Sequence, residues 1–527
     1  GWPRARLLLG ELCLADDDFD AARHHWEAAF GELRRAGDLA GAIRAAADLA
    51  MLHASAWGNA SLARGWIERG GRLVRQMDRC VEAGYLALAI LGCDQPDVTA
   101  VERNAELALA LALEFGDHSL EVRALAEWGF ALVAEGNVPE GFRRLEEAMA
   151  AITAGEVSEP GIIGMSFCSM LSACDRSGET ARAQEWTAVV AEYLERHGGG
   201  FRILHTHCRI TYGSVLCSIG RWPEAEAVIL EALSPRGSKA LSHRAEASAH
   251  LADLRIGQGR LEEAAALLAP FEDCIACCAP LARLHLARGN ADLAAAVVDR
   301  GLAVLVGDRV RAAPLLALLV EAEVARHRPA AAAAGAAALQ DLVAPIDSPV
   351  FDAEAAVAAA RAASAAGEPE RAVRHLVAAQ RRLAGHDRPA MAALVHLELA
   401  RALGETGRRA QAVAEGRAAQ AIFSRLGARR DADRVAAVLR GLGERGLPGR
   451  PPPAPSLLSR RERDVLDLVR EGLTNAEIGR RLFISPKTAE HHVSRVLMKL
   501  GVRSRAEAAA LAAGWPGSRP DVPVVGR

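Results

Sequence analysis

The chain has 527 residues, 24% of them charged and 4% aromatic, with a formal net charge of −3. This length predicts several domains, or one repeat array with a small module. No run of about 18 uncharged apolar residues occurs, which excludes a membrane-spanning helix. No signal peptide is visible either, so we expect a cytoplasmic protein. The ten cysteines are scattered, which favours reduced thiols over a disulfide framework.

The net charge hides an asymmetry along the chain. Residues 457–527 contain 13 basic and 8 acidic residues, a net charge of +5, so the preceding 456 residues carry −8. A basic end on an acidic body indicates that only the C-terminal end meets nucleic acid.

Residues 1–444 are rich in Ala, Leu, Arg and Glu and show no lasting strand-like alternation. In a recurring pattern, a glycine is followed five positions later by a small residue near the start of an amphipathic helix. The pattern occurs at Gly58/Ala63, Gly136/Gly141, Gly178/Ala183, Gly220/Ala225, Gly259/Ala264, Gly289/Ala294, Gly367/Ala372 and Gly407/Ala412. Most intervals lie near 40 residues or twice that, which is typical of stacked helix pairs. The glycine would end the first helix in a left-handed turn, and the small residue would let the second helix pack closely.

The pattern resembles a tetratricopeptide-type solenoid with longer and less regular units. We expect about eleven helix pairs, with a capping helix at 428–444. Each unit buries its apolar face only against its neighbours, so the array is stable as a stack. Its concave surface is suited to a partner protein or a small effector, and the alternative is a plain spacer without a ligand.

Beyond the array, residues 445–456 (RGLPGRPPPAPS) contain five prolines, three of them consecutive, and predict an extended, semi-rigid linker. A compact module is expected at 457–515 and a disordered tail at 516–527.

Four helix starts are encoded within the 46 residues from Ser459 to Ser504. In a capping box the hydroxyl accepts from the third amide of a new helix, and the glutamate accepts from the cap's own amide. Such boxes are expected at Ser459/Glu462, Thr474/Glu477 and Ser504/Glu507. The remaining start is Ser485-Pro486, with proline at the first helical position. The very short turn around Phe483-Ile484 then predicts helix-turn-helix geometry.

The helix that begins at Pro486 has two different faces. An apolar stripe of helical period comprises Ala489, Val493, Val496, Leu497 and Leu500. The opposite face carries Lys487, Glu490, His491, Ser494, Arg495 and Met498. Two of the chain's three lysines, Lys487 and Lys499, lie in this helix. A polar, partly cationic helix of this kind suits the major groove of DNA, and the alternative is a solvated helix of a small bundle.

Together these motifs make residues 457–515 resemble the LuxR-type helix-turn-helix domain of bacterial transcription regulators. The resemblance rests on Ser459 to Glu462, the turn Glu471 to Asn475, Ile478 with Leu482, Ser485 to Thr488, His492-Val493, Lys499 to Val502 and Ser504-Arg505. It implies an all-α protein, in which a four-helix DNA-binding domain follows the repeats. Two positions depart from the family. Ala489 replaces the usual valine, and Glu490 stands where many members carry a cation or polar group, although a carboxylate can accept from cytosine N4.

The module's expected core is Val465, Leu466, Val469, Ile478, Leu482, Ile484, Val493, Val496, Leu497, Leu500 and Val502. For base edges we expect Glu490, His491 and Ser494, with Arg495 next, because they face outward and match the groove-facing positions of the family's recognition helix. For phosphates we expect Thr474, Asn475, Lys487, Thr488, Arg495 and Lys499. His492 lies at the edge of the apolar face and serves either packing or DNA.

The last helix carries small residues at helical spacing, namely Ala506, Ala509, Ala510 and Ala513. In the LuxR family this helix pairs two modules. The resemblance therefore implies a homodimer on a two-part DNA site.

Other constellations carry no chemistry. The CxxC at Cys274 and Cys277 and the His205–Cys208 segment lie in predicted helices, where cysteine is commonly a buried small residue. A zinc site needs about four converging ligands, so no metal is expected, and no cofactor or catalytic residue either. The sequence also contains no G-x-x-x-x-G-K-[ST] phosphate loop.

The order of parts resembles the large ATP-binding LuxR-type regulators, which carry a nucleotide-binding domain ahead of their repeats. Either that domain has been lost here, or it precedes Gly1 in a longer protein. We expect a sequence-specific regulator of transcription, more readily an activator, that binds double-stranded DNA. Its repeats would sense RNA polymerase, another protein or a small effector. The alternative is an interaction scaffold whose DNA-binding module is weak or vestigial.

Overall fold

The computed structural model describes residues 3–91, 98–196, 202–234, 237–444, 459–500, 504–505 and 508–509. The chain forms two compact units, Gly1–Gly443 and Glu444–Arg527. Throughout the described ranges the regular elements are helices and no strand occurs, which confirms the all-α class. The linker and the tail expected from the sequence lie outside the described residues.

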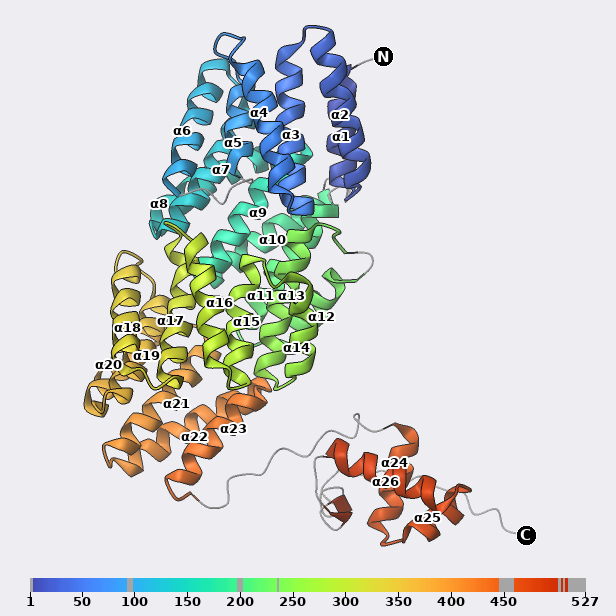
Figure 1. Cartoon of the computed structure of the whole chain (residues 1–527), viewed down its shortest axis with the longest axis vertical. Coiled ribbons are helices and arrows are strands. Elements are labelled where there is room, and N and C mark those ends of the chain that lie inside the picture. The colour runs from blue at the N-terminus through green and yellow to red at the C-terminus, as the bar shows by residue number, and fades with distance from the viewer. Residues whose placement is uncertain are drawn as a thin grey trace. The chain divides into compact units, whose positions relative to one another are not determined.

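The first unit is a stack of eleven helix pairs, counted over its described residues, that runs from α1 to α23 (Figure 1). The first helices of the pairs are α1 (Pro3–Ala15), α3 (Leu39–Trp57), α5 (Glu82–Leu91), α7 (His118–Glu135), α9 (Pro160–Ser177), α11 (Arg202–Ser218), α13 (Leu241–Gly257), α15 (Ile275–Ala287), α17 (Arg309–Ala325), α19 (Pro349–Ala365) and α21 (Pro389–Glu405). The second helices are α2 (Phe19–Arg35), α4 (Ala60–Val74), α6 (Val98–Phe115), α8 (Val138–Ala154), α10 (Thr180–Arg196), α12 (Trp222–Ala232), α14 (Leu261–Leu268), α16 (Ala291–Val304), α18 (Pro329–Val343), α20 (Pro369–Leu383) and α22 (Arg409–Leu426). A single 3₁₀ turn, η1 (Ala269–Phe271), follows α14, and α23 (Arg429–Gly441) closes the stack at the position expected for a capping helix.

The glycine pattern of the sequence is confirmed at all eight positions. Each of the eight glycines has a positive φ, from 62° at Gly58 to 98° at Gly136, so each one turns the chain between two helices as expected. The small residue five positions later is buried in every case, and seven of these residues are alanines with 0% exposure. Each repeat is therefore defined by a glycine in the left-handed backbone conformation and by a close contact between its two helices.

One such contact, backbone against backbone, joins α7 and α8. A Cβ atom built on Gly141 would lie 2.6 Å from the carbonyl oxygen of Gly129, and one built on Gly129 would lie 2.6 Å from that of Gly141. Because each helix meets the backbone of the other, neither glycine can be replaced unless the helices move apart.

We expect Gly141→Ala to lower the free energy of unfolding of the array by about 1–3 kcal/mol, the usual cost of an overpacked interior. Gly161→Ala is the matched control, because a Cβ atom there meets no heavy atom within 4 Å and alanine favours a helix by about 0.5–1 kcal/mol. Urea unfolding followed by circular dichroism measures both. Equal stability of the two variants would contradict the close crossing.

The array coils so that successive turns of its superhelix touch. α1 contacts α11, α3 contacts α13, α7 contacts α17 and α13 contacts α23, so each contact joins helices five pairs apart. The Asp17 carboxylate accepts hydrogen bonds from the Lys239 backbone N–H at 2.7 Å and the Ser238 hydroxyl at 3.2 Å. These contacts connect segments more than two hundred residues apart in sequence.

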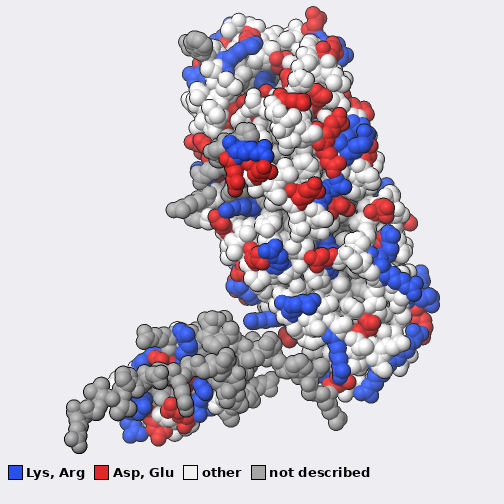
Figure 2. Space-filling view, turned by 180° about the vertical axis from the view of Figure 1, so that it is seen from behind, with Lys and Arg blue, Asp and Glu red and all other residues white. Residues whose placement is uncertain are grey.

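On the face of the array seen in Figure 2, acidic and basic side chains are interspersed. This visible face therefore lacks the single-sign basic surface that duplex DNA requires. Elsewhere in the array, charged side chains form ion pairs between separate segments, such as Arg4 with Asp38 and Arg79 with Glu114. None of the described helices is long and apolar enough to cross a bilayer.

The second unit contains three fully bounded helices, α24 (Arg460–Arg470), α25 (Asn475–Leu482) and α26 (Pro486–Leu500). A further helical turn begins at Ser504, where the Ala508 backbone N–H donates to the Ser504 carbonyl at 3.1 Å.

Candidate nucleic-acid interface

Two of the expected capping boxes are complete. The Ser459 hydroxyl accepts from the Glu462 backbone N–H at 3.3 Å, and the Glu462 carboxylate accepts from the Ser459 backbone N–H at 2.8 Å. The corresponding distances at Thr474 and Glu477 are 3.4 Å and 2.7 Å. These boxes fix the first residues of α24 and α25.

The start of α26 is also capped as expected. The Ser485 hydroxyl accepts from the Thr488 backbone N–H at 3.0 Å and lies 2.7 Å from the Thr488 hydroxyl. Of the third expected capping box, Ser504/Glu507, Glu507 lies outside the described residues.

Only three residues, 483–485, separate α25 from α26. Phe483 has a left-handed conformation with φ of 55°, and the Ile484 backbone N–H donates to the Gly479 carbonyl at 2.9 Å. A Cβ atom at Gly479 would lie 2.8 Å from the Ile484 carbonyl oxygen and 3.3 Å from the Pro486 nitrogen. The turn therefore passes directly over Gly479, a requirement that the sequence interpretation missed. The only signal for it was a glycine inside a helical pattern.

Two arginines hold the helices of this unit together, and the sequence interpretation missed the role of both. The Arg461 guanidinium donates to the Leu482 carbonyl at 2.6 Å, which connects α24 to the end of α25. The Arg505 guanidinium donates to the Leu473 carbonyl and, at 2.6 Å, to the Asn475 side-chain oxygen. Arg505 thereby joins the last helix to the loop between α24 and α25.

The core of the unit largely matches the expected set. Six expected residues are buried, namely Val465, Leu466, Val469, Ile478, Val493 and Val496, and three more pack at its edge, namely Leu482, Ile484 and Leu497. Leu468, Ala489 and Ala508 are also buried there. The side chains of Leu500 and Val502 lie outside the described part. Ala489 has 0% exposure, so this departure from the family lies on the buried face of α26, in the core of the unit.

The opposite side of α26 is open to solvent. Its exposed residues are Lys487, Thr488, Glu490, His491, Ser494 and Arg495, which include all the residues expected at base edges. The buried stripe and the exposed polar face thus divide α26 along its length. The side chain of Lys499 lies outside the described part.

Thr474 and Asn475 lie at the start of α25, and both have partners inside the unit. The Thr474 hydroxyl donates to Glu477 at 2.7 Å, and the Asn475 oxygen accepts from Arg505. Thr474 is nevertheless exposed, and Asn475 is half-buried. His492 is half-buried as well, and its Nδ1 is buried without a hydrogen-bond partner among the described residues, which favours packing over DNA contact for this ring.

The described thiols and imidazoles form no evident second site of chemistry. All the described cysteines are free, and Cys277 and Cys278 are buried. Within the described ranges, no group of three or more His, Cys, Asp or Glu side chains is placed to hold a metal ion.

Two capped helices joined by three residues, with a polar outer face on the second, are typical of a helix-turn-helix DNA-binding module. The sequence profile of the bacterial regulatory proteins, luxR family, matches residues 456–512. The spore germination protein GerE of Bacillus subtilis is 46% identical over 52 residues, which cover 10% of this chain and 70% of GerE. The chain belongs to the LuxR family of bacterial regulatory proteins.

Two other relatives are transcription regulators by name. The DNA-binding transcriptional activator DevR/DosR of Mycobacterium tuberculosis is 36% identical over 124 residues, covering 24% of this chain and 48% of that protein. The transcriptional regulatory protein LiaR of B. subtilis is 42% identical over 81 residues, covering 15% of this chain and 36% of LiaR. The chain thus spans about half or less of the length of these two relatives.

Among solved structures, the chain is similar to one in the crystal structure of the APC/C hetero-tetramer Cut9-Hcn1. The identity is 13%, the coverage is 97% of this chain and 96% of that one, and the TM-score is 0.39. The human IFIT1 dimer with m7Gppp-AAAA gives 14% identity, coverage of 75% and 90%, and a TM-score of 0.34. Neither score is high enough to support a conclusion about this chain.

Proposed function

We propose that the whole chain is a sequence-specific regulator of transcription that acts by binding rather than by catalysis. The observation that supports this most is α26, whose apolar stripe is buried while six polar residues on its other side are exposed. Lying in the major groove, the helix would present Glu490, His491 and Ser494 to base edges, with Arg495 beside them. Because its partner is chromosomal DNA, we place the protein in the cytoplasm.

The phosphate contacts in this proposal surround the same helix. Lys487 and Thr488 lie at its N-terminus, where backbone amides and the helix dipole favour an anion. Arg495 and Lys499 lie further along it, and Thr474 and Asn475 lie at the start of α25. Such contacts position the duplex, while base contacts specify the sequence.

We further propose that two modules pair through the helix that begins at Ser504, so that the protein reads a two-part site as a homodimer. The repeat array would sense a partner or effector and pass the signal on to RNA polymerase. The name of the relative DevR/DosR, a transcriptional activator, favours activation over repression.

The test is a mobility-shift titration of the full chain on duplexes selected from a random pool, at several salt concentrations. A regulator that makes several phosphate contacts loses affinity by about 0.9 log unit per contact per log unit of salt. We expect Lys487→Ala and Arg495→Ala each to weaken binding and to reduce this slope by about 1. Lys239→Ala is the matched control, because it removes the third lysine of the chain, which is exposed on the array.

Unchanged binding in both α26 variants would show that the docking face is assigned wrongly. A full chain that selects no sequence at all would instead favour the alternative, an interaction scaffold with a vestigial module.

A further inference from the structure

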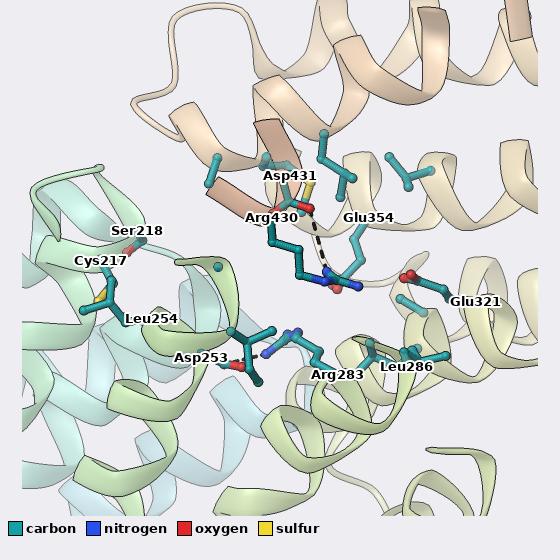
Figure 3. A pocket seen from close by; sticks show the side chains of 18 of the residues that line it. Cys217, Ser218, Asp253, Leu254, Arg283, Leu286, Glu321, Glu354, Arg430 and Asp431 are labelled. Carbon is teal, nitrogen blue, oxygen red and sulfur yellow. Dashed lines mark hydrogen bonds and ion pairs between the residues drawn. The ribbon is translucent and has the colours of Figure 1, made fainter. Parts of the chain in front are cut away.

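The C-terminal half of the array contains a partly open cavity of about 480 Å³. The cavity is lined mainly by the first helices of successive pairs, from α11 to α21, and by α23 (Figure 3). This volume lies within the range of about 300–1,000 Å³ that is usual for small-molecule sites.

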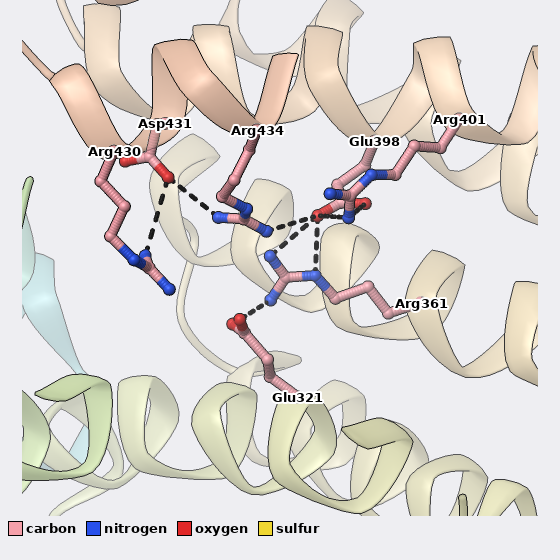
Figure 4. A network of polar contacts seen from close by, with 7 residues as sticks. All are labelled: Glu321, Arg361, Glu398, Arg401, Arg430, Asp431 and Arg434. Atoms are coloured by element: carbon pink, nitrogen blue, oxygen red, sulfur yellow. Dashed lines mark hydrogen bonds and ion pairs between the residues drawn. The ribbon is translucent and has the colours of Figure 1, made fainter. Parts of the chain in front are cut away.

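One cation of the cavity wall is poorly paired. Arg430 extends from α23 into the cavity (Figure 3), and its ion pair, with Asp431, is 3.8 Å long. The other arginines nearby are held tightly. Arg361 lies 2.6 Å from Glu321 and 2.9 Å from Glu398, and Arg434 lies 2.9 Å from Asp431 (Figure 4). Burial, with a smaller contribution from Arg434, lowers the pKa of Arg430. A bound anion would therefore relieve an incompletely compensated charge.

Polar atoms without partners lie elsewhere on the same wall, among them one oxygen of Asp253, whose other oxygen accepts from Arg283 at 2.5 Å. No hydrogen bond or ion pair joins the Glu354 carboxylate to any described residue, although Glu354 lines the cavity. Burial raises the pKa of Glu354 to about 7, and the neighbouring Arg283 and Arg361 offset this only in part. On α13, the Asp253 Oδ1 and His250 Nε2 atoms are buried without partners among the described residues. Buried polar atoms are nearly always hydrogen-bonded, so this cluster is suited to a ligand that donates.

The remaining lining is largely apolar, and the cavity as a whole has no excess of positive or negative residues. Leu254, Val357, Leu394 and Phe423 supply hydrocarbon surface. The charged residues of the described lining balance, with four arginines (Arg283, Arg361, Arg430 and Arg434) and four acids (Asp253, Glu321, Glu354 and Asp431). A ligand that carries one charge of each sign leaves this balance unchanged, whereas a simple anion or cation disturbs it.

We propose that the cavity binds a zwitterionic small molecule of the amino-acid or short-peptide class. Its ammonium group pairs with Glu354 and Asp253, its carboxylate pairs with Arg430, and its side chains pack against the apolar wall. This inference deepens the proposed function, and rests on it, in that it names the effector class sensed by the array. Because Arg430 belongs to α23, the last helix before residues 445–456, ligand binding connects that helix more firmly to the rest of the array.

The experiment is calorimetric titration of the full chain with the dipeptide Leu-Leu, with N-acetyl-Leu-Leu and with Leu-Leu amide. The first probe is a zwitterion, the second lacks the cation and the third lacks the anion. We expect Leu-Leu to bind at least about tenfold more tightly than either derivative, because each derivative lacks one of the two charge-assisted contacts. Glu354→Gln and Arg430→Gln should each weaken Leu-Leu binding by about tenfold or more. Glu370→Gln and Arg374→Gln are matched controls on the exposed face of α20 and should leave it unchanged.

Equal affinity for the three probes, or no binding of any, would overturn the proposal. So would equal effects of the cavity variants and their α20 controls. A mobility shift on the same protein keeps the two proposals distinguishable. Leu-Leu binding without DNA binding contradicts only the proposed function, and DNA binding without Leu-Leu binding contradicts only the ligand site.

The pH dependence supplies a second readout. The ammonium group requires an ionised Glu354, and with a pKa of about 7 this carboxyl is mostly protonated at pH 6. Between pH 6 and pH 7 the α-amino group of Leu-Leu stays mostly protonated, because its ordinary pKa is about 7.7–8.0. Leu-Leu should therefore bind about fivefold more weakly at pH 6 than at pH 7, and this difference should disappear in Glu354→Gln. The charged or titratable groups that line the cavity together with Glu354 are Cys217 on α11, His250 and Asp253 on α13, Arg283 on α15, Glu321 on α17, Arg361 on α19 and Arg430, Asp431 and Arg434 on α23. A pH dependence that survives in Glu354→Gln would assign the titration to one of these groups and overturn the role given to Glu354.

Discussion

Replacing Gly479 by valine is expected to abolish DNA binding by the full chain. A Cβ atom at this position would lie 2.8 Å from the Ile484 carbonyl oxygen and 3.3 Å from the Pro486 nitrogen, both of them backbone atoms. The turn between α25 and α26 would have to move away from α25, and α26 would move with it. Overpacking of this kind costs roughly 3 kcal/mol, a large share of the stability of a small module.

The measurements are a mobility shift and hydrogen exchange of the backbone amides in 459–500. In Gly479→Val we expect the shift to disappear and exchange in α25 and α26 to accelerate by about two orders of magnitude, which is equivalent to the same 3 kcal/mol. Ala476→Val on the exposed side of α25 is the control and costs only about 0.5 kcal/mol of helix propensity. Normal DNA binding by Gly479→Val would show that the turn can accommodate a side chain at this position.

The second large effect is expected at Glu398 in the array. This carboxylate has 6% exposure and pairs with Arg361 at 2.9 Å, Arg401 at 3.2 Å and Arg434 at 3.7 Å (Figure 4). Glu398→Ala leaves Arg361 and Arg434 partly buried without this partner. Removal of one member of a buried ion pair usually costs about 3–5 kcal/mol, so thermal unfolding should occur at a clearly lower temperature.

The exposed Glu370→Ala on α20 serves as the control and should change stability by no more than about 0.5 kcal/mol. Acid provides an independent check. Burial by itself raises the pKa of Glu398, but the surrounding arginines outweigh burial and hold the pKa at about 2, below its ordinary value of 4.5. The stabilisation is thus complete above pH 4.5 and is lost as the pH falls towards 2. If Glu398→Gln unfolds in acid like the unchanged protein, the network contributes little to stability.

Much of this fold follows from local signals in the sequence. The left-handed glycines and the small residues five positions after them mark where each helix pair turns. Both could be predicted because their effects depend only on residues close by in the sequence. The capping boxes at Ser459 and Thr474 are equally local, so the starts of α24 and α25 could be predicted from residue types three positions apart.

Contacts between distant segments could not be predicted in this way. Nothing near Asp17 indicates that it meets Lys239, because that contact depends on how far the superhelix rises in five pairs. The cavity is likewise lined by residues from α11 to α23. In the sequence, its charged residues cannot be distinguished from ordinary solvent-exposed ones. In the candidate interface, the apolar stripe of α26 predicted which face of the helix is buried and which is exposed. The roles of Gly479 and Arg505 could not be predicted, because they depend on how the turn and the last helix pack in three dimensions.

The contacts between helices five pairs apart alter how the array should unfold. In an open solenoid each repeat touches only its neighbours, and its ends can fray while the middle remains intact. Here α13 touches both α3 and α23, so the loss of pairs at either end also uncovers a surface near the centre. The array should consequently unfold in one cooperative transition. A substitution that destabilises its first helices should also lower the stability of its last helices.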